Sequence, residues 1–139
     1  MRVRIAALAD YASISLGDKL NVLGVFSTIM ARQEPVVHAQ MQLVVQLEFD
    51  PTEAGKKESR IMLVDRDGRE LLATGGEIVV PRAPLGEPAV INQILVLNSV
   101  TFPRFGRYEF RLLINGRLEA TIPVTVKRVR EPDNPQMVA

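Results

Sequence analysis

Apolar and polar residues alternate with a period of two along much of this chain, and that alternation restricts the fold more than any other feature. The clearest case is residues 38–49, HAQMQLVVQLEF. The apolar members are Met41, Leu43, Val45, Leu47 and Phe49, and Gln40, Gln42, Gln46 and Glu48 lie between them. Because successive side chains of a β-strand point to opposite faces, this pattern predicts a half-buried strand and not a helix.

Turn residues separate the predicted strands. The segment GRYEFRLLINGRLEATIPVTV, residues 106–126, contains two strand patterns around an Asn-Gly pair, which is typical of a tight hairpin turn. A two-residue turn would place Leu112 opposite Glu119 and mix the buried and exposed faces. We therefore predict a three-residue loop, 114–116, which pairs Leu112 with Leu118 on one face.

The number and spacing of these segments predict the fold class. Further strands are expected at 3–9, 20–29, 77–80 and 91–102. Asp50 followed by Pro51 and Glu53 predicts at most one short helical turn, near residues 50–55. Tyr108, in the sequence GRYEF, is typical of a tyrosine corner. Seven or eight strands with short turns predict an all-β fold, an antiparallel two-sheet sandwich that is immunoglobulin-like or C2-like.

The length of 139 residues fits one domain. We assign residues 1–130 to the sandwich and residues 131–139, EPDNPQMVA, to a flexible C-terminal tail. No apolar run approaches the roughly 18 residues of a membrane span. The N-terminal run IAALA is shorter than the apolar stretch of about 7–15 residues in a signal peptide. We therefore expect a mature N-terminus and a cytoplasmic protein.

Composition excludes several kinds of chemistry. The chain has no cysteine, which excludes disulfides, thiolate nucleophiles and cysteine-ligated metals. Its single histidine, His38, excludes a histidine-rich metal site within one chain. His38 falls on the polar side of its strand, so neither Ser13 nor Ser15 has an evident base to activate it. We therefore expect no enzymatic activity and no cofactor.

The net charge is +1, from 17 basic and 16 acidic residues. Binding to nucleic acid needs an excess of positive charge facing the phosphates, and this balance does not supply one. The basic ends MRVR and VKRVR would make a local patch if the termini met. We favour solvated charge at both ends and expect no nucleic-acid partner.

Asp65 and Asp67, in the sequence DRDG, are the candidate metal ligands. Acidic loops of this kind hold calcium in C2-like sandwiches, and calcium takes roughly six to eight oxygen ligands. Arg66 and Arg69 add positive charge to the same loop. The alternative interpretation is an Asp-Gly hairpin turn without a metal.

Two predicted strands are apolar on both faces. In residues 20–29, Leu23 and Val25 lie on the face opposite Leu20, Val22 and Phe26, so this strand is expected to be central or covered by a partner. In residues 91–102, one face has Ile91, Leu95 and Leu97, and the other has Ile94, Val96, Val100 and Phe102. A two-layer sandwich buries one face of each strand.

The second face must therefore be covered by the loop 81–88, by the tail or by another chain. Cover by another chain would create an interface formed by Leu23, Val25, Ile91, Leu95 and Leu97. The expected function is accordingly a non-catalytic protein-interaction or assembly module, as a homo-oligomer or with an unidentified protein partner. The alternative is a calcium- or small-ligand-binding C2-like domain.

Three segments carry a family likeness: DYASISLGDKLNVLGVF from residue 10, EAGKKESRIMLVDRDGREL from residue 53 and FPRFGRYEFRLLINGRLEATIPVTV from residue 102. Their order resembles a family of small bacterial proteins recorded only as a domain of unknown function. The resemblance covers most of the chain and implies a β-sandwich. It implies no particular activity, ligand or catalytic residue.

Overall fold

The computed structural model describes residues 1–129, and the flexible tail expected at residues 131–139 lies outside this range. The described chain has nine strands and one turn of 3-10 helix. The strands are β1 (Arg2–Ser15), β2 (Lys19–Phe26), β3 (Thr28–Ala31), β4 (Val36–Phe49), β5 (Gly55–Asp65), β6 (Glu70–Val80), β7 (Ala89–Phe102), β8 (Gly106–Ile114) and β9 (Arg117–Arg128), and the 3-10 turn is Pro51–Glu53.

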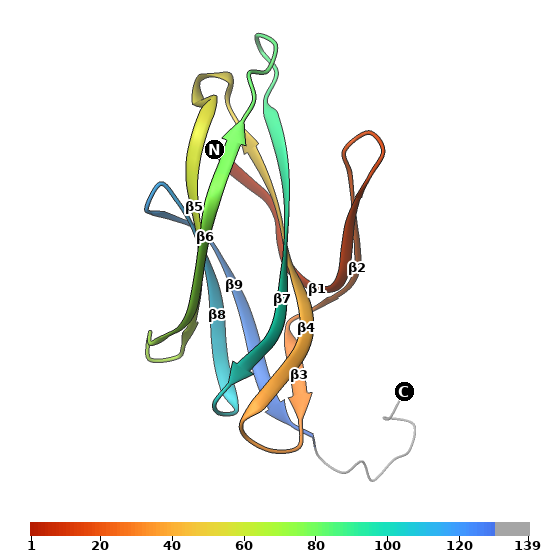
Figure 1. Cartoon of the computed structure of the whole chain (residues 1–139), viewed down its shortest axis with the longest axis vertical. Coiled ribbons are helices and arrows are strands. Elements are labelled where there is room, and N and C mark those ends of the chain that lie inside the picture. The colour runs from red at the N-terminus through yellow and green to blue at the C-terminus, as the bar shows by residue number, and fades with distance from the viewer. Residues whose placement is uncertain (130–139) are drawn as a thin grey trace.

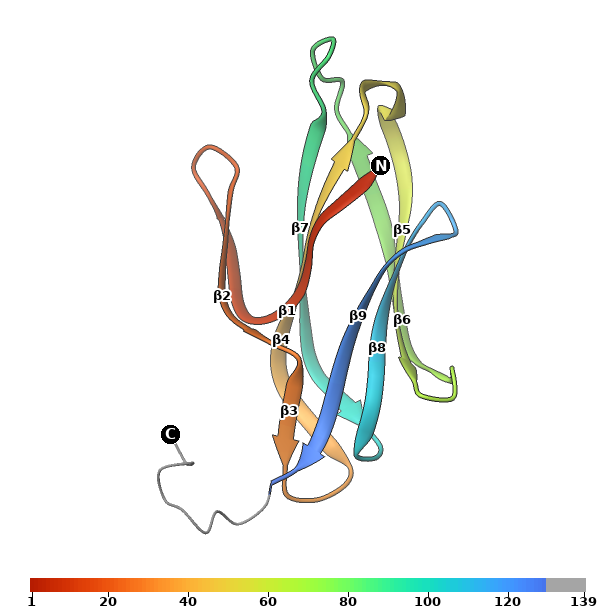
Figure 2. The same cartoon turned by 180° about the vertical axis from the view of Figure 1, so that it is seen from behind.

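These strands form two sheets (Figure 1, and from behind in Figure 2). Sheet A has the order β2-β1-β4-β7, and sheet B, which curls into a half-barrel, has the order β3-β9-β8-β5-β6. The all-β prediction is confirmed, with nine strands in place of seven or eight. The sheets are not wholly antiparallel, because the chain crosses from sheet A to sheet B after β2 and β3 then runs parallel to β9.

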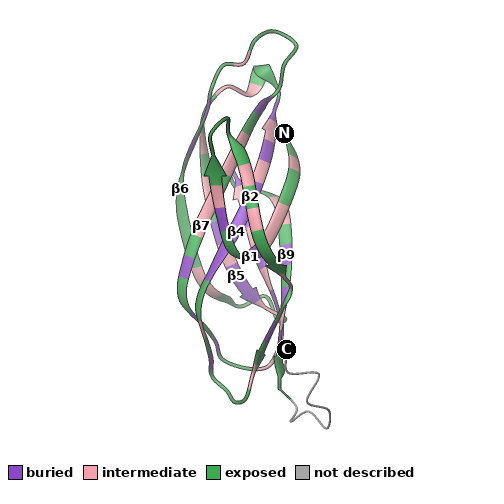
Figure 3. Ribbon diagram, turned by 90° about the vertical axis from the view of Figure 1, so that its right-hand side faces the viewer, coloured by how far each residue is buried: buried purple, intermediate pink, exposed green. Residues whose placement is uncertain are grey.

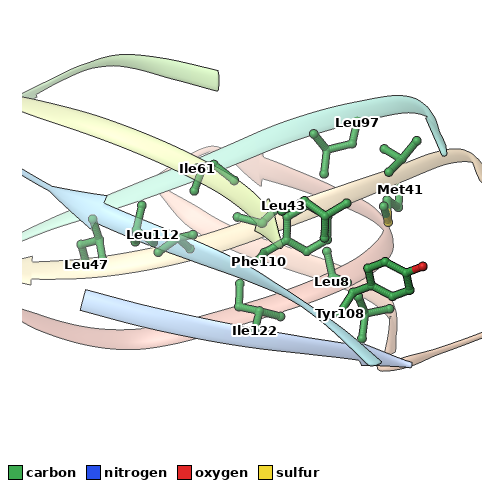
Figure 4. Packing of buried hydrophobic residues seen from close by; sticks show 14 of the residues in the cluster. Leu8, Met41, Leu43, Leu47, Ile61, Leu97, Tyr108, Phe110, Leu112 and Ile122 are labelled. Carbon is green, nitrogen blue, oxygen red and sulfur yellow. The ribbon is translucent and has the colours of Figure 1, made fainter. Parts of the chain in front are cut away.

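The core lies between the two sheets and is built from the alternate residues of the central strands. On β4, the predicted inward residues Met41, Leu43, Val45, Leu47 and Phe49 are all buried. They meet Phe110 and Leu112 of β8 and Ile61 of β5 (Figure 4). The strand predicted for residues 38–49 and its inward face are therefore confirmed, but Gln42 and Val44 on the opposite face are buried as well.

The two faces predicted for β7 are wrong in part, because the alternation shifts within the strand. Ser99 has a φ of 52°, a left-handed conformation that interrupts the regular pleat. Val100 consequently lies in the same core as Leu97, although the two residues are three positions apart. Ile94, on the other side, packs in a separate cluster.

The hairpin of β8 and β9 has a two-residue turn, so the predicted three-residue loop is wrong. Asn115 and Gly116 have φ values of 50° and 77°, and Ile114 pairs with Arg117. The register then shifts, so that Leu112 pairs with Ala120. A β-bulge inside β9 thus keeps buried and exposed residues on separate faces, which is the effect expected of the three-residue loop.

Two local predictions are confirmed. The helical turn near residues 50–55 is present, and the Asp50 N–H donates to Glu53 Oε1 at 3.2 Å. Tyr108 forms the tyrosine corner: its hydroxyl donates to the Arg104 carbonyl oxygen at 2.6 Å and accepts from the Arg104 N–H at 3.1 Å. These bonds fix the turn between β7 and β8.

The N-terminal ammonium of Met1 donates to Glu53 Oε1 at 2.8 Å in a partly buried ion pair. The hydrogen bond from the ammonium lowers the pKa of Glu53 below its ordinary 4.5, although burial acts in the other direction. The hydrogen bond from Glu53 raises the pKa of the ammonium above its ordinary 8.0. This pair therefore links the chain terminus to the 3-10 turn in a pH-dependent way.

Replacing Glu53 by glutamine should lower the free energy of unfolding by at most about 1 kcal/mol, and only within a pH window. The contribution is complete between pH 4.5 and pH 8.0. It is lost as pH falls through the lowered pKa of Glu53 and as pH rises through the raised pKa of the ammonium. Urea unfolding of both proteins across pH checks this expectation, and a difference independent of pH would contradict it.

Candidate functional site

Residues 1–129 offer neither a helix long and apolar enough to cross a membrane nor a group of three or more His, Asp or Glu residues that could hold a metal ion. The candidate serine and histidine side chains lie on separate parts of the fold. Ser13 and Ser15 are on the β1–β2 hairpin, whereas the His38 ring lies against Phe26 with 5.8 Å between ring centroids. Three other features of the surface could bind a ligand or a partner.

The first feature is the β1–β2 hairpin, which leaves the sandwich as an arm and crosses the outer side of β4 and β7 (Figure 3). β1 pairs with β4 only as far as Ala9, and beyond it pairs with β2 alone. Asp10 and Gly24 lie next to each other at the start of the arm. Gly24 has a φ of +71°, and a Cβ there would lie 2.5 Å from Asp10 Oδ2. Gly24 thus leaves room for the Asp10 side chain.

The arm covers part of the outer face of sheet A. Ala9 and Ala12 of β1 form a small apolar cluster with Val44 of β4, and Leu20, Val22 and Ile94 pack against it. Two polar contacts hold the arm down. The Ala12 N–H donates to the buried Gln42 Oε1 at 2.8 Å, and Asn92 Nδ2 donates to the Asp18 carbonyl oxygen at 3.1 Å. The second apolar face of β7 is therefore covered in part by the first hairpin, which the sequence did not indicate.

The five residues predicted to form an interface fall into two groups. Leu97 is buried, with 7% of its surface exposed, and Ile91 and Leu95 pack half-buried against the same core. In contrast, Leu23 and Val25 are 69% and 65% exposed. β2 is an edge strand of sheet A and not a central one, so its outer side has no strand beside it in the described chain. Of the five predicted interface residues, only Leu23 and Val25 have largely exposed side chains that a partner can contact.

The second feature is an apolar slit between the free edges of β6 and β7. It opens toward core residues that include Leu43, Ile61 and Leu95, and Gly75 and Gly76 lie at its edge. Its volume is about 120 Å³. Ligand pockets usually measure roughly 300–1,000 Å³, so the slit is too small to hold a ligand of ordinary size.

The third feature includes the predicted calcium ligands. Asp65 Oδ1 accepts the backbone N–H groups of Asp67 and Arg69 at 2.9 and 2.8 Å, which closes the β5–β6 turn. The Gly68 N–H donates to the Asp65 carbonyl oxygen at 3.0 Å. The carboxylate of Asp65 thus stabilises a hairpin turn. Within residues 1–129, no third acidic residue joins Asp65 and Asp67 to form a possible metal site.

The same turn lines a pocket of about 520 Å³ at one end of the sandwich, together with the β7–β8 turn. Arg66 and Arg69 come from the first turn, Arg104 from the second, and Arg107 from the start of β8. We refer to it as the arginine pocket. Sequence reasoning used Arg66 and Arg69 only as an argument against calcium and did not consider Arg104 or Arg107. The available signal was one pair of arginines in the DRDG turn and a second pair near the junction of two predicted strands, but nothing in the sequence placed these two regions side by side.

Comparison with known proteins identifies the family. A family of unknown function, DUF6941, matches residues 4–127. The chain belongs to this family. The family resemblance predicted from the three sequence segments is therefore confirmed. Membership of DUF6941 assigns no activity to the chain. None of the curated proteins matches the sequence.

Two solved structures show limited similarity. One is the alkylpurine DNA glycosylase AlkC of Pseudomonas fluorescens bound to DNA containing an abasic site analog, with 13% identity, a TM-score of 0.45 and coverage of 88% of this chain but 31% of that one. The other is a β-glucuronidase from glycoside hydrolase family 2, with 14% identity, a TM-score of 0.39 and coverage of 66% and 11%. The chain thus spans only a minor part of either protein, and neither similarity supports a functional argument.

Proposed function

We propose that this DUF6941 protein is a non-catalytic β-sandwich module that assembles with a second copy of itself through the free edge of β2. The observation that carries the proposal is the exposure of Leu23 and Val25 on an edge strand. Tyr11, directly opposite Leu23 on β1, is also exposed. These apolar side chains thus lie beside the backbone N–H and C=O groups on the free edge of β2, with which a further strand can form hydrogen bonds.

Edge strands of natural proteins are normally protected against pairing by charged residues, by proline, by short length or by a covering segment. The edge strand β3 has only four residues. On the edge strand β6, Glu70 and Glu77 form ion pairs with Arg60 and Lys56. Residues 20–26 of β2, LNVLGVF, contain neither a charged residue nor a proline. β7, the other edge strand of sheet A, also lacks charge and proline, but its most exposed large apolar side chains, Val90 and Val96, are only 41% and 47% exposed. β2 is therefore the unprotected edge strand with the most exposed apolar side chains.

A second copy is the simplest partner for such an edge. In a dimer with two-fold symmetry each subunit uses the same surface, so an apolar edge strand meets an equally apolar one. Antiparallel pairing of the two β2 strands would join both copies of sheet A into one continuous sheet. A single strand pair buries little surface, so we expect an association that depends on protein concentration.

We also propose an immunoglobulin-like architecture for the two sheets. The tyrosine corner at Tyr108 supports an immunoglobulin-like architecture over a C2-like one, because a Tyr hydroxyl bonded to nearby backbone is a feature of immunoglobulin-like sandwiches. We further propose a bacterial, cytoplasmic protein, to which the lack of cysteine is suited.

Light scattering across a range of protein concentrations tests self-association. We expect a mass that rises from monomer toward dimer, and we expect the double variant L23K/V25K to remain a monomer at the highest concentration, because like charges would face each other across the two-fold axis. Val79→Lys, on the exposed part of edge strand β6, is the matched control and should still associate. A wild-type protein that stays monomeric, or loss of association in the control as well, would exclude the β2 edge as the contact.

A further inference from the structure

The arginine pocket brings together cationic side chains from two turns that are distant in sequence. Arg66 and Arg69 lie in the turn between β5 and β6, and Arg104 and Arg107 in and just after the turn between β7 and β8. Both turns are at the same end of the sandwich (Figure 1). We infer that this pocket binds a small anion with two linked phosphate groups, such as pyrophosphate or a nucleoside diphosphate. This inference does not depend on the proposed self-association.

The charge of these arginines is not neutralised within the protein. Other arginines, including Arg60 and Arg111, have a carboxylate oxygen at 3.0 and 2.7 Å. Within residues 1–129 none of the four pocket arginines has a carboxylate within 4.0 Å. The acidic residues that line the pocket are Asp65 and Asp67, so four guanidinium groups stand against two carboxylates.

Two further charged groups, both in contact with Phe105 of the pocket lining, do not cancel this excess. Glu34 Oε1 accepts the Phe105 N–H at 2.9 Å, and the Arg128 guanidinium lies 5.3 Å from the centre of the Phe105 ring. One further acidic group and one further basic group are therefore present beside the pocket. The Asp65 carboxylate, for its part, is held by two backbone N–H groups and faces the interior of its own turn.

The backbone beneath the arginines is held by specific hydrogen bonds. The tyrosine corner binds both the N–H and the carbonyl oxygen of Arg104, and Asp65 exchanges backbone and side-chain bonds with residues 67–69. The arginine side chains themselves are exposed and free to reach a ligand. A site of this kind orders little backbone on binding, which limits the entropic cost.

The chemistry of the guanidinium group indicates the ligand class. Its planar fork of N–H donors matches phosphate oxygens in paired hydrogen bonds, and such charge-assisted bonds are stronger than neutral ones. Four guanidinium groups offer more donors than one phosphate can accept, so a diphosphate suits them better than a monophosphate. The volume of about 520 Å³ lies within the usual range for small-molecule pockets.

Isothermal titration calorimetry of the full chain in a phosphate-free buffer tests this inference. The probes are pyrophosphate, a nucleoside diphosphate and inorganic phosphate, with sulfate at matched ionic strength as the reference for unspecific screening. We expect pyrophosphate and the nucleoside diphosphate to bind at least tenfold more tightly than phosphate or sulfate. Equal affinities for all four anions would overturn the inference.

Arg69→Gln and Arg104→Gln take one arginine from each turn, and each should weaken pyrophosphate binding about tenfold or more. Arg82→Gln is the control, because Arg82 is exposed in the loop between β6 and β7 and does not line this pocket. Equal weakening by all three variants would overturn the inference, as would a DNA oligonucleotide that binds tightly and is not displaced by pyrophosphate. Thermal unfolding of each variant confirms that the fold is intact.

Discussion

Replacing Phe110 by alanine should lower the free energy of unfolding by about 3–5 kcal/mol, because it leaves a cavity where the two sheets meet. Phe110 has 0% of its surface exposed and lies in β8, between β5 and β9. In Figure 4 its ring stands among Leu43, Leu8 and Ile61. Domains of this size are stable by only about 5–15 kcal/mol, so the variant would lose a large part of its stability.

Urea unfolding followed by circular dichroism measures this effect, with Leu118→Ala as the matched control. Leu118 of β9 is 53% exposed, so its truncation should change the free energy of unfolding by about 0.5 kcal/mol or less. If Phe110→Ala cost no more than the control, the burial of the Phe110 side chain between the two sheets would be wrong.

Replacing Gln42 by leucine should cost about 1–3 kcal/mol, although leucine is the more apolar residue. Gln42 is 7% exposed, and its Oε1 accepts the Ala12 N–H at 2.8 Å beneath the arm. Leucine would leave that buried N–H without a partner. The loss should also loosen the arm, so that the Ala12 amide exchanges its hydrogen faster than in the wild type.

Gln40→Leu on the same strand is the control for this second variant. Gln40 Nε2 donates to Asn98 Oδ1 at 3.0 Å, but this bond is exposed, and water can replace either partner. We therefore expect little change in stability or in exchange at Ala12. Equal losses for the two variants would show that the buried bond to Ala12 does not hold the arm in place.

The two proposals place their sites on different parts of the molecule. Self-association uses the outer edge of β2, on the arm, whereas the arginine pocket lies at the end of the sandwich formed by the β5–β6 and β7–β8 turns. The variants L23K/V25K and Arg104→Gln should therefore act independently, since residues without shared contacts have nearly additive effects. Pyrophosphate binding should be unchanged in L23K/V25K.

Local patterns in the sequence sufficed for much of the fold. The alternation on β4 identified its buried residues, the Asp50–Glu53 pattern identified the 3-10 turn, and GRYEF identified the tyrosine corner. Each of these depends on residues within a few positions of one another, so the local chemistry is sufficient to specify it. The same reasoning named Leu23 and Val25 as interface residues, and both are exposed, although their strand lies at an edge of sheet A and not at its centre.

The remaining features depend on contacts between segments that are distant in sequence. The shift of faces at Ser99 and the bulge in β9 are irregularities of backbone conformation, which the alternation of residue types does not reveal. The first hairpin lies over β4 and β7, where Ala12 and Val22 pack in one apolar cluster with Val44 and Ile94, and these residues are distant in sequence. The arginine pocket has the same origin: the sequence supplies two pairs of arginines in and beside two turns, and only the pairing of β5 with both β6 and β8 brings these turns to one end of the protein.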